Sequence, residues 1–263
     1  MTTPSAIQIF GQNRLDKYCV LSATSGVALL PNIYDQKPDT VWQSSGGNSD
    51  TVVQNVDISF KTAAGISVSQ DFDTVILLNH NLKLTTAMLS PDGTNWDYIT
   101  GWVPTFTAPN IISSLPYPQH TPSYDFTGGV PYFRLHMFST QTANQEKSIG
   151  ELKFVKSIAT LNVLSDWKRK DAVKSGFMRM SDGSAVAWQD WQKVEGTLSL
   201  QNVSLVDKQA ILAAIAANDF LTFAFFYNFD PTEIFEFRVV EPPQIGFDRK
   251  SQLYSLDLSL KER

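Results

Sequence analysis

Hydrophobic and polar residues alternate along several short stretches of the chain, and turn-forming residues separate these stretches. Residues 132–138 place Phe133, Leu135 and Met137 on one side of the chain and Arg134 and His136 on the other. An alternation with a period of two is typical of a β-strand that buries one face. The same alternation predicts strands at residues 194–200 and 253–261. Apolar-rich runs predict further strands at residues 72–78, 84–90, 151–155, 221–229 and 234–240.

One segment has a helical signature. Ser204 precedes an apolar-rich run, and Asp207 follows it three residues later, which is the spacing of a capping box. Ile211, Leu212 and Ile215 then recur on one side of the predicted helix, which covers residues 205–218. The pattern therefore predicts a mainly β protein whose C-terminal part is a smaller antiparallel β domain with one helix.

The style of the sequence changes between residues 161 and 176, where a polar, basic stretch is followed by Ser175 and Gly176. This change predicts two domains, residues 1–162 and residues 163–263. A further segment, residues 103–131, contains six prolines and has no steady period. Long irregular segments are uncommon in compact domains. Two interpretations of this segment remain open: an insertion that lies over a sheet, and an arm that contacts a partner.

Composition and charge exclude several classes of protein. Of 263 residues, 43% are hydrophobic and 18% are charged, which suffices for a full core. The formal net charge of −5 does not favour a specific nucleic-acid partner. Cys19 is the only cysteine, so the chain forms no internal disulfide. The first ten residues have no secretory signal pattern, and no apolar run is long enough to insert into a membrane.

The sequence lacks the motifs that usually mark catalytic sites. It contains no phosphate-binding glycine loop, no nucleophile elbow and no HExxH zinc motif. The three histidines stand in unrelated contexts, and no pair of carboxylates is marked by a tight motif. We therefore expect that the protein is not an enzyme.

Four short motifs resemble the discoidin-type, galactose-binding-like jelly rolls. The first comprises Asn32, Asp35, Thr40 and Trp42 in an N-x-x-D-x-x-x-x-T-x-W segment. The others are residues 73–82, residues 90–96, and residues 132–135 together with residues 149–152. The resemblance covers approximately residues 15–160. It implies an N-terminal galactose-binding-like jelly-roll β-sandwich in which Trp42 packs in the core.

In that family, the loop at the start of the sandwich and a glutamate near its end surround a structural calcium ion. Calcium prefers six to eight oxygen ligands. The resemblance implies ligands from the side chains of Asp35, Thr40 and Glu151 and from backbone oxygens nearby. The full predicted set is Asn32, Asp35, Lys37, Thr40, Gly150 and Glu151. The alternative is that Asp35 caps the turn and Thr40 donates a hydrogen bond to it.

Many jelly rolls of this type bind sugars through aromatic rings on their loops. The aromatic residues placed to stack on a sugar ring in this way are Trp96, Trp102, Tyr117 and Tyr124. Aromatic side chains also fill cores and protein interfaces, so both interpretations of these four residues remain open.

The C-terminal part contains Trp188-Gln189-Asp190-Trp191, a predicted strand through Leu198, the predicted helix and the run from Phe225 to Pro231. In this order they resemble the distal-tail and tail-tip (baseplate) proteins of long-tailed bacteriophages, over approximately residues 165–263. This resemblance implies a structural protein of the virion tail, assembled in the host cytoplasm as a ring of three or six copies with other tail proteins. The sandwich would then contact neighbouring tail proteins or polysaccharide on the host surface. The alternative hypothesis is a monomeric carbohydrate-binding module or adhesin.

Overall fold

The computed structural model describes residues 6–35, 40–46, 48–116, 119, 121–161, 166–179, 185–227 and 230–262. The chain divides into two compact units. One comprises residues 13–157 and is called the sandwich unit here. The other combines residues 1–12 with residues 158–263 and is called the hairpin unit. Lys37, Tyr117 and His120 lie outside the described residues.

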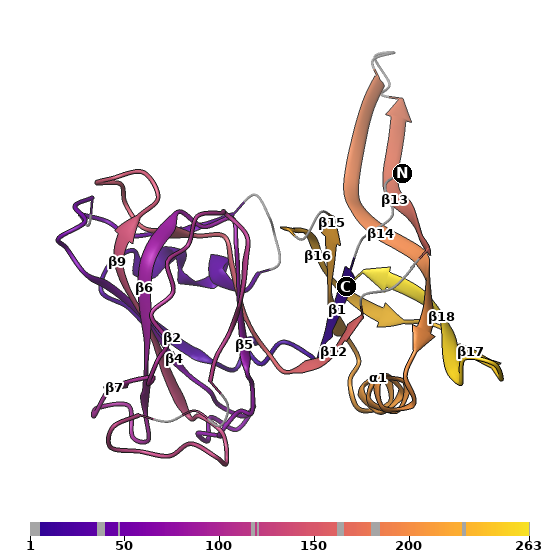
Figure 1. Ribbon diagram of the computed structural model, residues 1–263. Coiled ribbons are helices and arrows are strands. Elements are labelled where there is room, and N and C mark those ends of the chain that lie inside the picture. The colour runs from indigo at the N-terminus through magenta and orange to yellow at the C-terminus, as the bar shows by residue number, and fades with distance from the viewer. Residues whose placement is uncertain are drawn as a thin grey trace. The chain divides into compact units, whose positions relative to one another are not determined.

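The sandwich unit contains two main antiparallel sheets and a short pair of strands (Figure 1). The larger sheet has the order β2 (Val20–Ala23), β4 (Gln54–Ser59), β9 (Tyr132–Thr140), β6 (Leu82–Ser90) and β7 (Asp97–Tyr98). The smaller sheet has the order β11 (Glu151–Val155), β5 (Thr74–Leu78) and β8 (Ile111–Ser114). The pair is β10 (Ser148–Ile149) with β3 (Trp42–Gln43), and a 3₁₀ helix, η1, covers Val27–Ile33.

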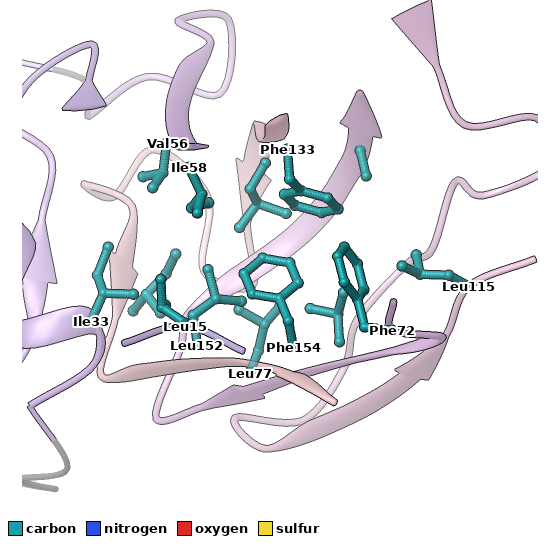
Figure 2. Close-up of a cluster of buried hydrophobic side chains, with 14 of the residues drawn as sticks. Leu15, Ile33, Val56, Ile58, Phe72, Leu77, Leu115, Phe133, Leu152 and Phe154 are labelled. Atoms are coloured by element: carbon teal, nitrogen blue, oxygen red, sulfur yellow. The ribbon is translucent and has the colours of Figure 1, made fainter. Parts of the chain in front are cut away.

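The two sheets bury one face each. Val56, Ile58 and Phe133 from the larger sheet and Leu152 and Phe154 from the smaller sheet belong to one buried cluster, shown in Figure 2. Ring edges pack against ring faces, as in Phe133 and Phe154, whose centroids lie 4.7 Å apart. This core explains why β4 and β9 alternate so regularly in sequence, because their other face remains accessible to solvent.

The proline-rich segment at residues 103–131 is part of the sandwich. Its residues 111–114 form β8, which pairs with β5. Phe106, Leu115 and Phe126 are each buried in the core. The described part of this segment therefore contributes a strand and core residues to the sandwich, and its contact with a partner stays a prediction. The absence of a steady period in the sequence concealed a short edge strand between two buried loops.

The hairpin unit is built on one sheet with the order β12 (Ser157–Leu161), β1 (Ala6–Phe10), β15 (Leu221–Tyr227), β16 (Asp230–Val239), β18 (Leu253–Glu262), β14 (Ala185–Val203) and β13 (Asp166–Arg179). A further strand, β17 (Gln244–Asp248), pairs with β18. Helix α1 (Leu205–Ala217) places Ile211 and Ala214 in the core of this unit. Ser204 caps the helix, because its Oγ accepts a hydrogen bond of 3.1 Å from the backbone N–H of Asp207.

The predicted domain boundary at residue 162 needs two corrections. The first strand, β1, pairs with β15, so residues 6–12 belong to the hairpin unit and not to the sandwich. Residues 166–179, interpreted as part of a boundary, form β13. Trp167 is buried there against Phe225, whereas Lys168 is exposed. β13 therefore resembles a linker in sequence because it is an edge strand rich in polar residues.

β13 and β14 form a ribbon whose far half extends beyond the rest of the sheet (Figure 1). The register pairs residues 166–179 with residues 185–199, and a β-bulge lies between Lys174 and Ser175. β18 contacts only the near part of β14, from Glu195 to Val203. Among the described strands, the far half of the ribbon thus has only its own two strands to pair with.

The predicted fold class is confirmed by these elements. The chain is mainly β, with an N-terminal jelly-roll β-sandwich and a smaller C-terminal antiparallel β domain that carries one α-helix. Within the part of the chain that the structure describes, no helix is both long and apolar enough to span a membrane.

Candidate functional site

A pocket of about 390 Å³ lies in the sandwich unit where the start of β3 meets the loop between β9 and β10. Seven of its eight described lining residues are of polar type, and five of these seven carry carboxamides. The described residues that line it are Val41, Gln43, Asn48, Asn81, Asn144, Gln145, Glu146 and Ser148. Glu146 is the one charged side chain among them.

The local backbone explains why these side chains converge. β3 and β10 pair through Gln43 with Ser148 and through Trp42 with Ile149. Trp42 is fully buried, as the sequence predicts, and fixes this ladder to the core. Asn81 connects to the loop before β10 and to its first residue. Its Nδ2 donates to the carbonyl oxygen of Glu146 at 2.7 Å, and its Oδ1 accepts from the N–H of Ser148 at 2.9 Å.

Several polar groups in the pocket retain hydrogen-bonding capacity. Gln43 Nε2 donates to Glu146 Oε2 at 2.8 Å, which leaves the side-chain carbonyl oxygen of Gln43, Oε1, to accept. Asn144 Oδ1 accepts from the N–H of Asp50 at 3.3 Å, which leaves the Asn144 NH₂ group to donate. Asn48 and Gln145 are exposed at the rim. The pocket therefore presents both donors and acceptors.

A buried lysine lies directly behind the pocket. Lys147 has no exposed surface, and its ammonium group donates to the carbonyl oxygens of Ser49 and Val52 at 2.9 and 2.8 Å. Its backbone also exchanges hydrogen bonds with Ser44, at 2.9 Å each. Burial lowers the pKa of the Lys147 ammonium, and the nearby carboxylate of Asp50 opposes that effect. The loop that carries Asn48 is thus held from within.

The residues predicted to bind calcium are only partly brought together. Because Trp42 pairs with Ile149, the end of the first loop lies beside the strand that leads to Gly150 and Glu151. Thr40 Oγ1, however, donates to both carboxylate oxygens of Asp35, at 2.9 and 2.8 Å. Asn32 uses its side-chain NH₂ to bind the carbonyl oxygen of Val41. These contacts match the alternative in which Asp35 and Thr40 stabilise a turn.

The charge at Glu151 does not fit a calcium ligand. Its carboxylate lies 2.6 Å from the ammonium group of Lys153, and both side chains are largely buried. The Lys153 ammonium would repel a calcium ion bound at this carboxylate. Among the described residues, no group of three or more His, Cys, Asp or Glu side chains gathers at one point. The pairing of Glu151 with Lys153 argues against calcium at this carboxylate, and the calcium site stays a prediction.

The aromatic residues predicted to stack on a sugar have different environments. Trp102 is 4% exposed and donates from its indole N–H to Ser113 Oγ, so the prediction that it forms a sugar platform is wrong. Tyr124 is half-buried against the core. Trp96 lies on the outer face of the larger sheet, where the guanidinium of Arg134 is 4.2 Å from its ring centroid. Tyr117 lies outside the described residues.

The sequence analysis did not identify the pocket residues. Gln43, Asn144 and Glu146 belong to no fixed motif, and Gln43 is 103 positions from Glu146 in the chain. The signal that was present is a concentration of amides and glutamate at residues 141–146, together with the Asn-His-Asn stretch at residues 79–81. Only the pairing of β3 with β10 shows that these segments meet.

Searches with the sequence find no matching family model and no matching curated protein. The solved structures that match in fold include the family 32 carbohydrate-binding module of NanJ from Clostridium perfringens, in complex with galactose. It has 13% identity, covers 57% of this chain and 99% of that chain, and has a TM-score of 0.41. A second is chitosan-binding module 1 of a chitosanase/glucanase from Paenibacillus sp. IK-5, with 19% identity, coverage of 55% and 98%, and a TM-score of 0.41.

A third match is a module designated CBM32-5, also from Clostridium perfringens, in complex with GalNAc-β-1,3-galactose. It has 16% identity, covers 55% of this chain and 99% of that chain, and has a TM-score of 0.41. At these identities and TM-scores, the ligands are those of the matched proteins alone. The resemblance of the C-terminal part to bacteriophage tail proteins stays a prediction.

Proposed function

We propose that the sandwich unit binds a neutral carbohydrate in the amide-lined pocket. The observation that carries this proposal is the concentration of carboxamides around Glu146 in one concave site of about 390 Å³. A carboxamide offers a donor and an acceptor in one plane, and each hydroxyl of a sugar also donates and accepts. Concave sites of this size with a few convergent polar groups are typical of small-ligand binding.

The composition of the pocket supports a neutral ligand. Glu146 would repel an anion, and the ammonium of Lys147 is already occupied by two backbone carbonyl oxygens. The pocket also favours binding over hydrolysis. Sugar hydrolysis usually requires two carboxyl groups on opposite sides of the bond, and Glu146 is the one carboxylate among the described lining residues.

Titration calorimetry with the full chain tests the proposal. The probes are galactose, N-acetylgalactosamine, glucose, N-acetylglucosamine and mannose. We expect saturable binding of at least one sugar, weakened tenfold or more by Asn144→Ala or Glu146→Gln. Gln201→Ala removes an exposed carboxamide from the other unit and serves as the matched control. If none of the five sugars binds, or if both pocket variants bind like the wild type, the proposal is wrong.

We also propose that the hairpin unit assembles with protein chains, as the tail-component hypothesis requires. The observation in favour is a group of exposed apolar residues, Leu205, Val206, Ile245 and Phe247, at the start of α1 and on β17. The Phe247 ring contacts the Tyr254 ring in a tilted arrangement, and the Lys208 ammonium lies over the same Tyr254 ring, so these elements adjoin. Exposed apolar patches of this kind mark interaction sites. The virion location and the ring of three or six copies are further predictions of this hypothesis.

A further inference from the structure

The outer face of the larger sheet carries a row of flat side chains. On β9, Phe133, Leu135 and Met137 are fully buried, so the alternate residues face outward. These outward residues are Tyr132, Arg134, His136 and Phe138. Together with Asp57, Trp96 and Tyr98, they are called the β9 face here.

The centre of the β9 face is rigid. Arg134 binds Asp57 on the neighbouring β4 through two parallel hydrogen bonds, from Nε to Oδ1 at 2.6 Å and from Nη2 to Oδ2 at 2.7 Å. The same guanidinium lies over the ring of Trp96, 4.2 Å from its centroid. A bidentate pair of this kind fixes both orientation and distance. The indole is therefore positioned before any ligand arrives.

Three more rings continue the row. His136 lies edge to face with Phe138 at 4.7 Å and with Tyr98 at 5.9 Å between centroids. Tyr98 is 48% exposed, and it stands on a two-residue edge strand. His136 Nδ1 is held 2.6 Å from Asn55 Oδ1. Burial and, secondly, the charge of Arg134 lower the pKa of His136, while Asp57 opposes them, so the ring is neutral at pH 7.

The charge of the β9 face indicates the chemistry of its ligand. Asp57 neutralises Arg134, and His136 is uncharged at neutral pH, so the face has no net charge to attract a nucleic acid or an anionic polymer. Aromatic rings next to fixed polar groups instead match the alternation of C–H faces and hydroxyls on a sugar chain.

The length of the face indicates a polymer. Four outward positions on one strand, from Tyr132 to Phe138, span about 20 Å at the rise of an antiparallel strand. That length exceeds a single sugar ring. We propose that the β9 face binds an extended neutral polysaccharide, with Trp96 and Tyr98 stacking on sugar rings and Arg134 hydrogen-bonding to hydroxyls. The proposal rests on the carbohydrate-binding function and adds a second surface, distinct from the amide-lined pocket.

Affinity gel electrophoresis tests the second surface. The full chain migrates through native gels that contain barley β-glucan, galactomannan or xylan. We expect at least one of the three to retard the wild type, and Tyr98→Ala and Trp96→Ala each to weaken the apparent affinity at least fivefold. Tyr18→Ala removes another exposed tyrosine, 43% accessible and outside the β9 face, and should migrate like the wild type. Melting temperatures of all variants show whether the fold is kept.

The pocket variant Asn144→Ala separates the two carbohydrate proposals. It should lose monosaccharide binding in calorimetry and keep its retardation by the polysaccharide, whereas Tyr98→Ala should show the reverse. Retardation that survives both Tyr98→Ala and Trp96→Ala overturns the inference, and so does a wild type that none of the three polysaccharides retards. Monosaccharide binding that remains in either case leaves the pocket function intact.

Discussion

The ammonium group of Lys147 donates a hydrogen bond of 2.9 Å to the carbonyl oxygen of Ser49, and both groups lie behind the wall of the amide-lined pocket. A lysine with no exposed surface is unusual because desolvation of its charge is costly. The second bond, to the carbonyl of Val52, satisfies the ammonium further. Lys147 therefore acts as an internal cation that orders the loop beside the pocket.

Replacing this lysine should loosen the loop. Lys147→Met keeps most of the side-chain volume but removes both hydrogen bonds of the ammonium group. The Ser49 carbonyl oxygen still accepts from the N–H of Val52, whereas the Val52 carbonyl oxygen loses the lysine as its donor. We expect a loss of about 2–4 kcal/mol in the free energy of unfolding, measured by urea denaturation. Amide hydrogen exchange should become faster at residues 44–52. Lys83→Met, at an exposed position of the same unit, is the control. An unchanged stability of Lys147→Met would show that the two bonds contribute nothing.

The pair of Arg134 and Asp57 should contribute a measurable coupling energy. The two side chains are 22% and 26% exposed, so solvent screens them in part. A double-mutant cycle with Arg134→Met and Asp57→Ala should give about 1 kcal/mol of coupling in urea denaturation, and high salt should reduce it. A coupling near zero at low salt would mean that the geometry of the pair has no energetic consequence.

Calcium should have little effect on this protein. Since Lys153 already neutralises Glu151, we expect the same melting temperature in EDTA and in excess CaCl₂. A site saturated to one hundred times its dissociation constant would add about 2.7 kcal/mol of stability. A clear rise of the melting temperature with calcium would therefore contradict the assignment of Glu151 to an ion pair with Lys153 in place of a calcium ion.

Lys153 should contribute strongly to the stability of the sandwich unit. Lys153→Met leaves the Glu151 carboxylate without its ammonium partner, and we expect a loss of about 3 kcal/mol in urea denaturation. The double variant Lys153→Met, Glu151→Gln should recover part of that loss, because it removes the buried carboxylate charge. A double variant no more stable than Lys153→Met would point to packing rather than charge as the role of the lysine.

The sequence predicted the elements that have a regular period. β9, β11 and α1 lie where alternation or capping placed them, because each buries one face against a core and carries a local signal of its own. Local pattern could not assign β1 to the hairpin unit. Its apolar residues Ile7 and Ile9 would fill either core equally well, and only pairing with β15 decides between them.

The pocket and the β9 face differ in how predictable they were. Trp96 was recognised because it ends a hairpin motif, but its contact with Arg134 depends on the register of β6 and β9. Trp102 was predicted for the same role, but it lies in the core, where its indole N–H donates to Ser113 of β8. Residue type thus suggested which side chains could stack on a sugar, and strand pairing determined which of them are exposed.

The exposed apolar residues of β17 should mediate association if the hairpin unit assembles. Ile245 and Phe247 are 50% and 53% exposed, and β17 pairs with β18 alone among the described strands. We expect the double variant Ile245→Ser, Phe247→Ser to lower the mass measured by light scattering after size exclusion, with little change in melting temperature. A wild type that stays monomeric at high concentration would contradict self-association and leave only assembly with other chains.

His80 should make the sandwich unit sensitive to mild acid. The ring is 3% exposed, its Nδ1 accepts from the N–H of Leu82 at 3.1 Å, and burial lowers its pKa to about 4. The unfolded chain binds a proton near pH 6.5, whereas the folded chain does not until about pH 4. Stability is therefore complete above pH 6.5 and declines as the pH falls through that window.

The size of the effect follows from the two pKa values. Between pH 7.5 and pH 5, urea denaturation should show a loss of about 2 kcal/mol from His80. His80→Asn should flatten this part of the pH profile. His136, whose pKa is also lowered by burial, contributes in the same direction, so His136→Asn provides the comparison. Since carboxylates titrate mainly below pH 5, they affect this window little. A profile that keeps its slope in His80→Asn would show that the buried ring is protonated in the folded state.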